Sequence, residues 1–539
     1  MPSPRAGALA ASAAILFLLP ACAPASSPAT GFLGTGSPGQ GVLVVTAGGT
    51  ALVDGQADVP PTLDLRVVGS TTLSPDTVRA RLDGGALALA QGGGGAVTAS
   101  VAPMPLGSAH TLDLSVPDRQ AQHFAFHVAP AAGVAAAVHS DSKDGTVLDL
   151  AFEFAPTDPK SVEAALPKGA AVTWSDQTHL RAAWPSAPGG SLTLPRDLST
   201  DRGSHLASSF SVRLDAVPPG ALRRQAVPDA GAVAGRPLVV AFTVATAASR
   251  ASLQAHAGRI SVASPTGVRI NSDGSLSGEP DAAAVAIAKS AGIQVWPLLQ
   301  NDASDSSGIA ALLQDDAAVN RLVGAAAALD FPGLHLDVEG VPAESRDRLS
   351  VFVQRLADAL HRRGHTLAVA VVPHKPGHLN LYSAAYDLQA ISGTADLVTL
   401  MAYDEHTGLT DPGPVAGYDW DGQVLAGSLA EMRSHGTALL GLPLYSRAWD
   451  SGDVTADAYA ASVANALQSP GARVDYDFGE ATPSIHYGNG AVLWFDDALS
   501  LETKASLVGD QKLHGVALWR LGFEDPGFWA TLPANPPRP

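Results

Sequence analysis

The stretch from Phe331 to Glu339 spaces three ionisable side chains two residues apart, with apolar residues between them. The three are His335, Asp337 and Glu339. Since side chains on a strand alternate between its faces, a strand here would present all three on one face and bury the other. Two neighbouring carboxyl groups resist simultaneous ionisation, which helps to keep one of them protonated near neutral pH. The pattern predicts acid–base chemistry, and an acidic strand end that caps the next helix is the alternative.

Residues 237–533 predict the scaffold that positions this strand. Their near-continuous apolar runs are typical of strands buried on both faces. The runs are Leu238 to Val244, Ile293 to Leu299, Leu334 to Val338, Leu367 to Val372, Leu397 to Met401 and Val516 to Trp519. Helical patterns lie between them, as from Asp347 to Arg363. Repeated strand–helix units without a glycine-rich phosphate loop favour an α/β fold of the (β/α)8 TIM barrel type, with catalytic residues such as Glu339 at the carboxyl ends of strands.

Two stretches before the barrel, residues 41–130 and 131–217, predict all-β domains of the immunoglobulin-like sandwich type. Short alternating runs separated by turn signals support this interpretation, the clearest being Leu148 to Phe154. Residues 218–236 are expected to form a linker. We interpret both domains as structural spacers, and a wall-binding stalk is the alternative.

The N-terminal 22 residues predict an export signal. An uncharged stretch, Ala6 to Pro20, follows Arg5 and is too short for a comfortable membrane span. Leu19 to Cys22 resembles a bacterial lipobox, and Cys22 is the single cysteine of the chain. We predict a lipoprotein signal peptide at 1–22, a flexible tether at 23–40 and a lipid anchor at the bacterial cell surface or periplasmic face. An ordinary secretory signal and a secreted protein are the alternative.

Composition and charge exclude other classes of function. The chain has 539 residues and 46% hydrophobic content, enough to bury the cores of several domains. Its net charge of -18 provides no basic field for nucleic acid. No metal-ligand spacing, nucleotide loop or Ser-His-Asp arrangement stands out. We therefore expect no metal and no cofactor, and we expect a monomer.

An ordered series of motifs between about Pro237 and Leu532 resembles glycoside hydrolase family 18, and more closely its bacterial subgroup of spore cortex-lytic N-acetylglucosaminidases. The motifs are Asp273 to Leu276, Gly333 to Glu339, Leu400 to His406, Asp411 to Ala416 with Trp420, Gly441 to Tyr445, Trp494 to Asp497, and Gly515 to Gly522 with Glu524 to Pro526. The segment from about 449 to 500 resembles the small α+β insertion that forms one wall of the substrate groove in that family.

The resemblance implies roles for three catalytic residues. Glu339 would be the general acid that protonates the leaving oxygen, and later the base that activates water. Asp337 would steady an oxazolinium-like intermediate formed when the substrate's own N-acetyl oxygen attacks. Tyr403 would donate its hydroxyl to the N-acetyl carbonyl. The outcome is substrate-assisted, retaining catalysis.

Six further residues are candidates for substrate binding. Asp404 would hydrogen-bond the sugar, and Trp519 would offer a flat apolar face for stacking, with a core tryptophan as the alternative. The full set is His335, Asp404, Trp519, Tyr445, Asn301 and Trp420. Packing or loop roles are equally open for the last three.

Two positions depart from the family pattern. Many members carry acidic residues where this chain has Pro332 and His335. His335 is either a neutral donor that orients Asp337 or a sign that the acid relay has been dismantled, and we favour the first. On that interpretation, protonating His335 would alter activity in mildly acidic solution.

The combined prediction is an exported glycosidase that cleaves β-linked N-acetylglucosamine glycans, with peptidoglycan as the leading substrate. A catalytically weak or inactive, lectin-like surface protein with the same barrel is the competing class. A chitinase is the third possibility, because the required N-acetyl group is common to both polymers.

Overall fold

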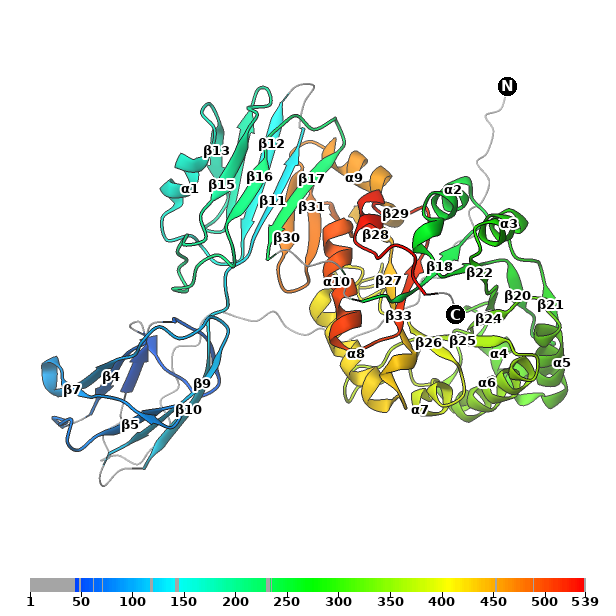
Figure 1. The fold of residues 1–539 in the computed structure, drawn as a ribbon, viewed down its shortest axis with the longest axis horizontal. Coiled ribbons are helices and arrows are strands. Elements are labelled where there is room, and N and C mark those ends of the chain that lie inside the picture. The colour runs from blue at the N-terminus through cyan, green and yellow to red at the C-terminus, as the bar shows by residue number, and fades with distance from the viewer. Residues whose placement is uncertain are drawn as a thin grey trace.

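The computed structural model describes residues 44–47, 50–61, 63–69, 71–116, 120–140, 145–228, 233, 235–450, 453–487 and 489–537. The predicted signal peptide, Cys22 and the tether lie outside the described residues. Figure 1 shows two β units, in blue and cyan to green, followed by a larger body of helices around strands. In the described part of the chain no helix is long and apolar enough to cross a membrane.

The larger body is built on a sheet of parallel strands that curls back on itself. Its parallel strands are β18 (Leu238–Thr243), β19 (Val262–Pro265), β20 (Val268–Ile270), β22 (Gln294–Val295), β23 (Leu298–Gln300), β24 (Gly333–Asp337), β25 (Thr366–Val371), β26 (Leu397–Leu400), β27 (Ala438–Pro443) and β33 (Gly515–Trp519). Pairing runs in the order β20-β23-β24-β25-β26-β27-β33-β18-β19-β22. Because β22 continues into β23 after Trp296 and Pro297, this series of pairings closes on itself, and the predicted α/β class is confirmed.

Helices cover the outside of this sheet and alternate with its strands along the chain (Figure 1). They are α2 (Ala247–Ala255), α3 (Ala282–Ser290), α4 (Ser306–Gln314), α5 (Asp316–Ala327), α6 (Arg346–His361), α7 (Leu388–Ser392), α8 (Tyr418–Glu431) and α10 (Ala498–Asp510). Helix α6 lies where a helical pattern was expected from Asp347 to Arg363, and it buries apolar residues that include Leu349, Phe352 and Leu356. Aspartates cap several helix N-termini with their side chains, as Asp305 does on α4 and Asp497 on α10.

The inside of the curled sheet holds a second, smaller core. Its buried members include Val240, Phe242, Trp296, Leu298 and Leu439. Trp296 fills the space beside β24, since a Cβ added at Gly333 would lie 2.7 Å from its Nε1. Only glycine therefore fits at the first position of the strand that carries the carboxyl groups.

An antiparallel sheet with one helix is inserted between β27 and α10. Its elements are β28 (Tyr445–Asp450), β29 (Asp453–Ala458), α9 (Tyr459–Leu467), β30 (Arg473–Asp477), β31 (Thr482–His486) and β32 (Val492–Trp494). The strand order is β29-β28-β32-β31-β30. This sheet begins at Tyr445, slightly before the predicted boundary at 449.

The first β unit consists of two five-stranded sheets with a core between them. One has the order β2-β1-β4-β8-β7 and the other β3-β10-β9-β5-β6. The strands are β1 (Val44–Ala47), β2 (Thr50–Ala51), β3 (Gln56–Val59), β4 (Asp64–Val68), β5 (Arg79–Leu82), β6 (Gly85–Ala86), β7 (Ala90–Gln91), β8 (Val97–Ser100), β9 (Ala109–Ser115) and β10 (Gln122–Val128). Two packed sheets agree with the expected sandwich; the immunoglobulin-like relationship stays a prediction.

The second β unit contains a five-stranded sheet, a β-hairpin and a short helix. The sheet order is β13-β14-β12-β11-β17, and β15 pairs with β16. The bounds are β11 (Val134–His139), β12 (Thr146–Phe152), α1 (Pro159–Ala165), β13 (Ala171–Trp174), β14 (His179–Trp184), β15 (Ser191–Leu194), β16 (Phe210–Arg213) and β17 (Leu222–Val227). Strand β17 pairs along its whole length with β11, so part of the segment expected to be a linker, Leu222 to Val227, is instead an edge strand.

This second unit packs directly on the insertion. Every residue of β11 and β12 is buried, because one face of their sheet covers the unit's own core and the other covers the insertion. Polar contacts cross the interface. Val474 donates its backbone N–H to Asp149 at 3.0 Å, and Arg181 donates to the carbonyl of Ala472 at 2.8 Å. The second β unit is therefore packed against the same body as the barrel, through the insertion.

A buried ion pair ties the same unit to the helix that follows the insertion. Arg224 on β17 donates from Nε to Asp497 at 2.6 Å, and the two side chains are 4% and 6% exposed. The guanidinium also lies over the ring of Tyr476, 4.7 Å from its centre. Asp497 simultaneously caps α10, so one carboxylate joins β17, the insertion and the helix.

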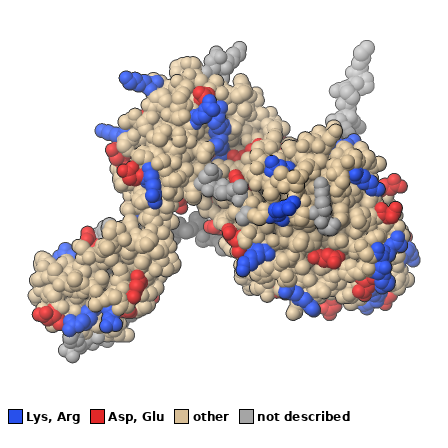
Figure 2. All heavy atoms as spheres, in the orientation of Figure 1, with Lys and Arg blue, Asp and Glu red and all other residues tan. Residues whose placement is uncertain are grey.

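On the face seen in Figure 2, Lys and Arg side chains are dispersed singly or in small groups among uncharged atoms. Acidic side chains lie among them. This distribution offers no continuous basic surface on that face, in line with the overall negative charge.

We predict that Arg224→Met lowers the free energy of unfolding by about 3–5 kcal/mol, because it leaves the Asp497 carboxylate buried without its cation. Urea unfolding followed by circular dichroism measures the change. Arg223→Met is the matched control, since the neighbouring Arg223 donates only to carbonyls of its own unit, at Arg213 and Asp215. Equal losses in the two variants would contradict a stabilising contact between the β unit and the N-terminus of α10.

Candidate active site

Asp337 and Glu339 lie at the carboxyl end of β24, as predicted. Asp337 ends the strand and is 6% exposed, while Glu339 follows it and is half-buried. Both side chains belong to the face of β24 that points into the curled sheet, the face that also carries His335. The paired carboxyl groups thus stand at the end of the barrel where parallel strands terminate.

Two neighbours hold the backbone that carries Glu339. Oδ1 of Asn301 accepts a hydrogen bond from the backbone N–H of Glu339 at 2.9 Å. Nδ2 of Asn301 donates to the backbone carbonyl of Glu339 at 2.8 Å. Tyr386 donates its hydroxyl to the carbonyl of Val338 at 2.9 Å. The backbone between the two carboxyl groups is therefore fixed from both sides.

This geometry changes the interpretation of Asn301. The sequence proposed a substrate contact, but both atoms of its amide group are engaged with backbone, and it is 8% exposed. Tyr386 was missed at the sequence level, because nothing in the local pattern between β25 and α7 shows that its hydroxyl reaches β24.

Asp337 receives a single side-chain hydrogen bond among the described residues. Gln300, the last residue of β23, donates from Nε2 to Oδ2 of Asp337 at 2.9 Å. The other oxygen, Oδ1, is buried and has no partner within the described part of the chain. Gln300 was also missed at the sequence level, and its position opposite Asp337 in the strand register is what brings the two together.

Burial raises the pKa of both carboxyl groups, and repulsion between negative charges adds to the rise at Glu339. Burial is the main cause for Asp337, opposed by the hydrogen bond from Gln300. For Glu339, burial again raises the pKa, and the nearby charges of Asp337 and Asp404 raise it further. More causes raise the pKa of Glu339 than that of Asp337, so Glu339 is the member of the pair that retains a proton near neutral pH.

Tyr403 follows β26 and stands beside these carboxyl groups. Its pKa is raised well above the usual value by burial and by the charges of Asp337 and Glu339. Its ring meets that of Tyr445 edge-on, with centres 6.5 Å apart. A Cβ at Gly441 would lie 3.1 Å from the Tyr403 ring. The hydroxyl is thus kept neutral and able to donate a hydrogen bond.

Asp404 is held by an arginine that sequence analysis missed. Arg447 on β28 donates from Nη2 to Asp404 Oδ1 at 2.7 Å, and the Tyr445 hydroxyl donates to the same oxygen. Asp404 has a positive φ of 63°, a conformation that aspartate tolerates better than most residues. The predicted residues Asp404 and Tyr445 therefore come together with Arg447 next to Tyr403.

His335 does not orient Asp337. Its Nε2 lies 3.1 Å from the hydroxyl of Thr399, its Nδ1 has no partner among the described residues, and its ring packs on Phe242 at 4.8 Å. The side chain is fully buried, and this burial lowers its pKa to about 3. The expectation that His335 orients Asp337 and titrates in mildly acidic solution is wrong, because the imidazole sits below the carboxyl groups inside the barrel.

The two tryptophans differ in position. Trp519 ends β33, is half-buried and meets Phe242 edge-on at 5.3 Å, which places it over the interior core. Trp420 lies in the first turn of α8, with the Lys375 ammonium 5.9 Å from its ring centre. Trp519 is therefore placed for stacking at the strand ends, while the contacts of Trp420 are with Lys375 and the outer core.

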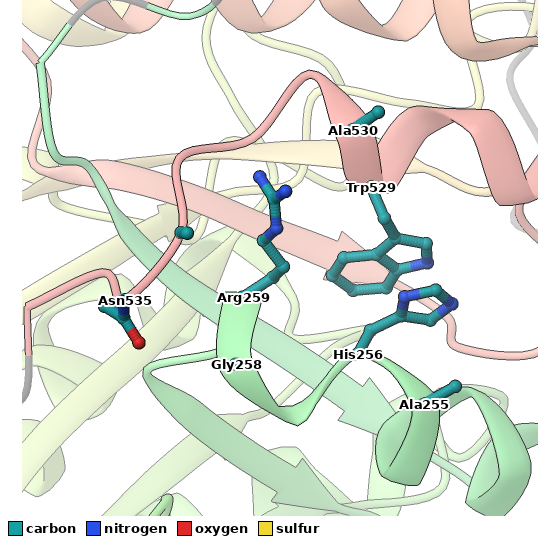
Figure 3. A pocket seen from close by; sticks show the side chains of 8 residues that line it. Ala255, His256, Gly258, Arg259, Trp529, Ala530 and Asn535 are labelled. Atoms are coloured by element: carbon teal, nitrogen blue, oxygen red, sulfur yellow. The ribbon is translucent and has the colours of Figure 1, made fainter.

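Cavities lie beside this site and far from it. One of about 210 Å³ borders Asn301 and Asp302. Figure 3 shows another, of about 420 Å³, near the N-terminal end of β19, the opposite end of the barrel from Asp337. There His256 stacks on Trp529 with ring centres 4.5 Å apart, and Trp529 is 3% exposed. The Trp529 ring that lines this cavity is therefore already covered by protein.

Among the described residues, no three His, Cys, Asp or Glu side chains lie together in a way that could bind a metal ion. What the arrangement offers is acid–base chemistry: a protonated Glu339, an ionisable Asp337 with one open oxygen, and a neutral Tyr403 hydroxyl.

Comparison with known proteins fits this chemistry. Residues 282–524 match the family profile described as glycosyl hydrolases family 18. The chain is 24% identical over 312 residues to an uncharacterized glycosylase of Bacillus subtilis, covering 55% of this chain and 90% of that protein. It is 25% identical over 224 residues to the cortical fragment-lytic enzyme of the same organism, covering 40% of this chain and 52% of that one.

A solved structure shows a related fold. The chitinase from Chromobacterium violaceum is 29% identical, with a TM-score of 0.51, and the alignment covers 55% of this chain and 97% of the chitinase. The likeness thus covers about half of this chain. The chain also spans only about half the length of the cortical fragment-lytic enzyme.

We predict that Glu339→Gln stabilises the fold at neutral pH. A carboxyl group whose pKa is raised in the folded state loses stability as pH rises above its unfolded pKa of about 4.3. The variant should therefore be more stable than the parent by about 1 kcal/mol or more at pH 7, and equally stable at pH 4. Urea unfolding at the two values tests this. Glu344→Gln, at an exposed position, is the control; a parallel gain there would contradict the assignment.

His335→Asn should change how stability depends on pH. Because the folded-state pKa of His335 is lowered to about 3, its contribution is fully present above the unfolded pKa of about 6.5 and is lost as pH falls toward 3. Between pH 7 and pH 5 the parent should lose about 2 kcal/mol more than the variant. The exposed His378, changed to Asn, provides the reference. Identical pH slopes for the parent and His335→Asn would show that His335 is not buried neutral.

Proposed function

Since the chain is a glycosidase whose barrel belongs to glycosyl hydrolases family 18, we propose that it cleaves β-linked N-acetylglucosamine glycans by substrate-assisted, retaining catalysis. One observation carries the proposal: Glu339, Asp337 and Tyr403 converge at the strand ends with protonation states suited to this reaction. The (β/α)8 barrel would serve as the frame and the insertion as one wall of the groove.

In the first step Glu339 donates its proton to the leaving oxygen as the glycosidic bond breaks. The substrate's acetamido oxygen forms the new bond to the anomeric carbon. Asp337 lies two residues back on the same strand face as Glu339, so it does not act as a separate nucleophile across the sugar ring. Its open oxygen Oδ1 instead accepts the acetamido N–H and stabilises the positive charge of the oxazolinium-like intermediate.

In the second step the Glu339 carboxylate takes a proton from water, whose oxygen bonds to the anomeric carbon and releases the acetamido oxygen. The configuration at that carbon is inverted twice and is therefore retained. Tyr403 donates its hydroxyl to the acetamido oxygen in the first step, because its raised pKa keeps it protonated. Trp519 stacks on the sugar, and Asp404, set by Arg447 and Tyr445, hydrogen-bonds it.

The choice of polymer is the finer part of the proposal. Likeness to the cortical fragment-lytic enzyme supports peptidoglycan, and likeness to a bacterial chitinase supports chitin as the second candidate. We favour peptidoglycan because the N-terminal segment with Cys22 would place the enzyme at a bacterial surface, either lipid-anchored or, alternatively, secreted. The two β units would be immunoglobulin-like, and the enzyme would act as a monomer.

Release of muropeptides from purified cell walls tests the proposal. The parent should release them, and Glu339→Gln should be slower by roughly 10²- to 10⁴-fold, because it lacks the general acid. Glu344→Gln should match the parent. Chitin oligosaccharides in a parallel assay separate the two polymers. Binding of the walls with equal, negligible release by the parent and by Glu339→Gln would instead favour the lectin-like alternative.

A further inference from the structure

Gln300 lies opposite Asp337 on the neighbouring strand, and its side chain hydrogen-bonds the Asp337 carboxylate. Strands β23 and β24 pair in parallel, and the register places Gln300 beside Asp337. Both side chains point to the inner face of the sheet, where Nε2 of Gln300 donates to Oδ2 of Asp337 at 2.9 Å. The contact joins two different strands, so it depends on the barrel and not on local sequence.

The other groups around Asp337 do not donate to it. Glu339 faces it from just after β24, Tyr403 from the segment after β26, and Tyr386 from the segment before α7. Tyr386 donates to the Val338 carbonyl. Asp404, which faces Glu339, is paired with Arg447. Within the described part of the chain, the Gln300 amide is the one hydrogen-bond donor that Asp337 has.

His335 is occupied elsewhere. It shares the inner face of β24 with Asp337, yet its Nε2 meets Thr399 on β26 and its ring packs on Phe242. The side chain two residues before Asp337 therefore supplies no donor to the carboxylate, and orientation must come from the neighbouring strand.

We propose that Gln300 is the positioning residue for Asp337, fixing one carboxylate oxygen so that the other, Oδ1, faces the acetamido N–H of the substrate. This inference rests on the proposed function, because it gives Gln300 a role in that reaction. A bond to Oδ2 removes the free rotation of a terminal carboxylate, which otherwise has a broad torsional preference. Oδ1 remains buried and unpaired within the described residues, ready to accept from substrate.

The uncharged donor also sets the ionisation of Asp337. An amide N–H stabilises the carboxylate and lowers its pKa against the rise caused by burial. A cation in the same place would neutralise the charge that the oxazolinium-like intermediate needs. Glutamine thus orients Asp337 and keeps it ionised without competing for its charge.

The test uses the full chain with Gln300→Met, which keeps the length of the side chain and removes its donor. We expect kcat to fall on the order of 10- to 100-fold with a smaller change in KM, because an oriented hydrogen bond to a charged group is lost. The acidic limb of the kcat/KM profile should move to higher pH, since Asp337 becomes harder to ionise. Gln300→Glu, of nearly the same shape, should move that limb further in the same direction through like-charge repulsion.

Gln354→Met is the matched control. Gln354 lies exposed on α6 and donates to Asp358 at 3.0 Å, so the same chemical change removes a glutamine–aspartate contact away from the site. It should leave kcat, KM and the pH profile unchanged.

The outcomes separate the two proposals. A parent enzyme that releases no product from any N-acetylglucosamine polymer would refute the proposed function itself. If the parent is active and its acidic limb coincides with the limbs of Gln300→Met and Gln300→Glu, the proposed role of Gln300 is overturned, even if the variants are slower. A merely structural defect lowers the rate without moving the acidic limb. Should Gln300→Met fail to fold, the limb of Gln300→Glu decides alone.

Discussion

Two carboxyl groups are buried together at the end of β24, and among the described residues no cation pairs with either one. Asp337 receives its hydrogen bond from the neutral amide of Gln300, and the backbone of Glu339 is held by Asn301. The nearby arginine, Arg447, is engaged with Asp404. Burial without a counter-charge raises the pKa of both groups, which is the condition for one of them to act as an acid near neutral pH.

The interior of the barrel supports this arrangement from below. Small and aromatic residues fill the space under the carboxyl groups, including Gly333 against Trp296 and His335 against Phe242. His335 stays neutral there because its burial lowers its pKa, so it adds no charge to the site. A packed floor of this kind fixes β24 in register with its neighbours, and register is what brings Gln300 and Asp337 together.

The insertion, which contacts the site through Arg447, belongs to a larger body than the barrel alone. The insertion packs one of its faces on the second β unit, and Arg224 reaches from β17 to the cap of α10. Arg447, which sets Asp404, lies on β28 of the same insertion. The second β unit thus contacts the element that carries part of the site, which is a physical reason for it to be fused to this barrel.

The sequence by itself determined the alternation on β24, the strand–helix repeat and the order of motifs that led to the proposed catalytic residues. These features are local, because period and residue type along one segment decide which face is apolar and where a strand ends. They also predicted the two all-β units and the insertion. Tertiary structure alone decided the partners. Gln300 lies 37 residues from Asp337, Thr399 lies 64 from His335, and Val474 lies 325 from Asp149. Contacts over such separations depend on register and on the packing of whole elements, so the role of His335, the edge strand β17 and the contribution of Arg447 became visible only in the folded chain.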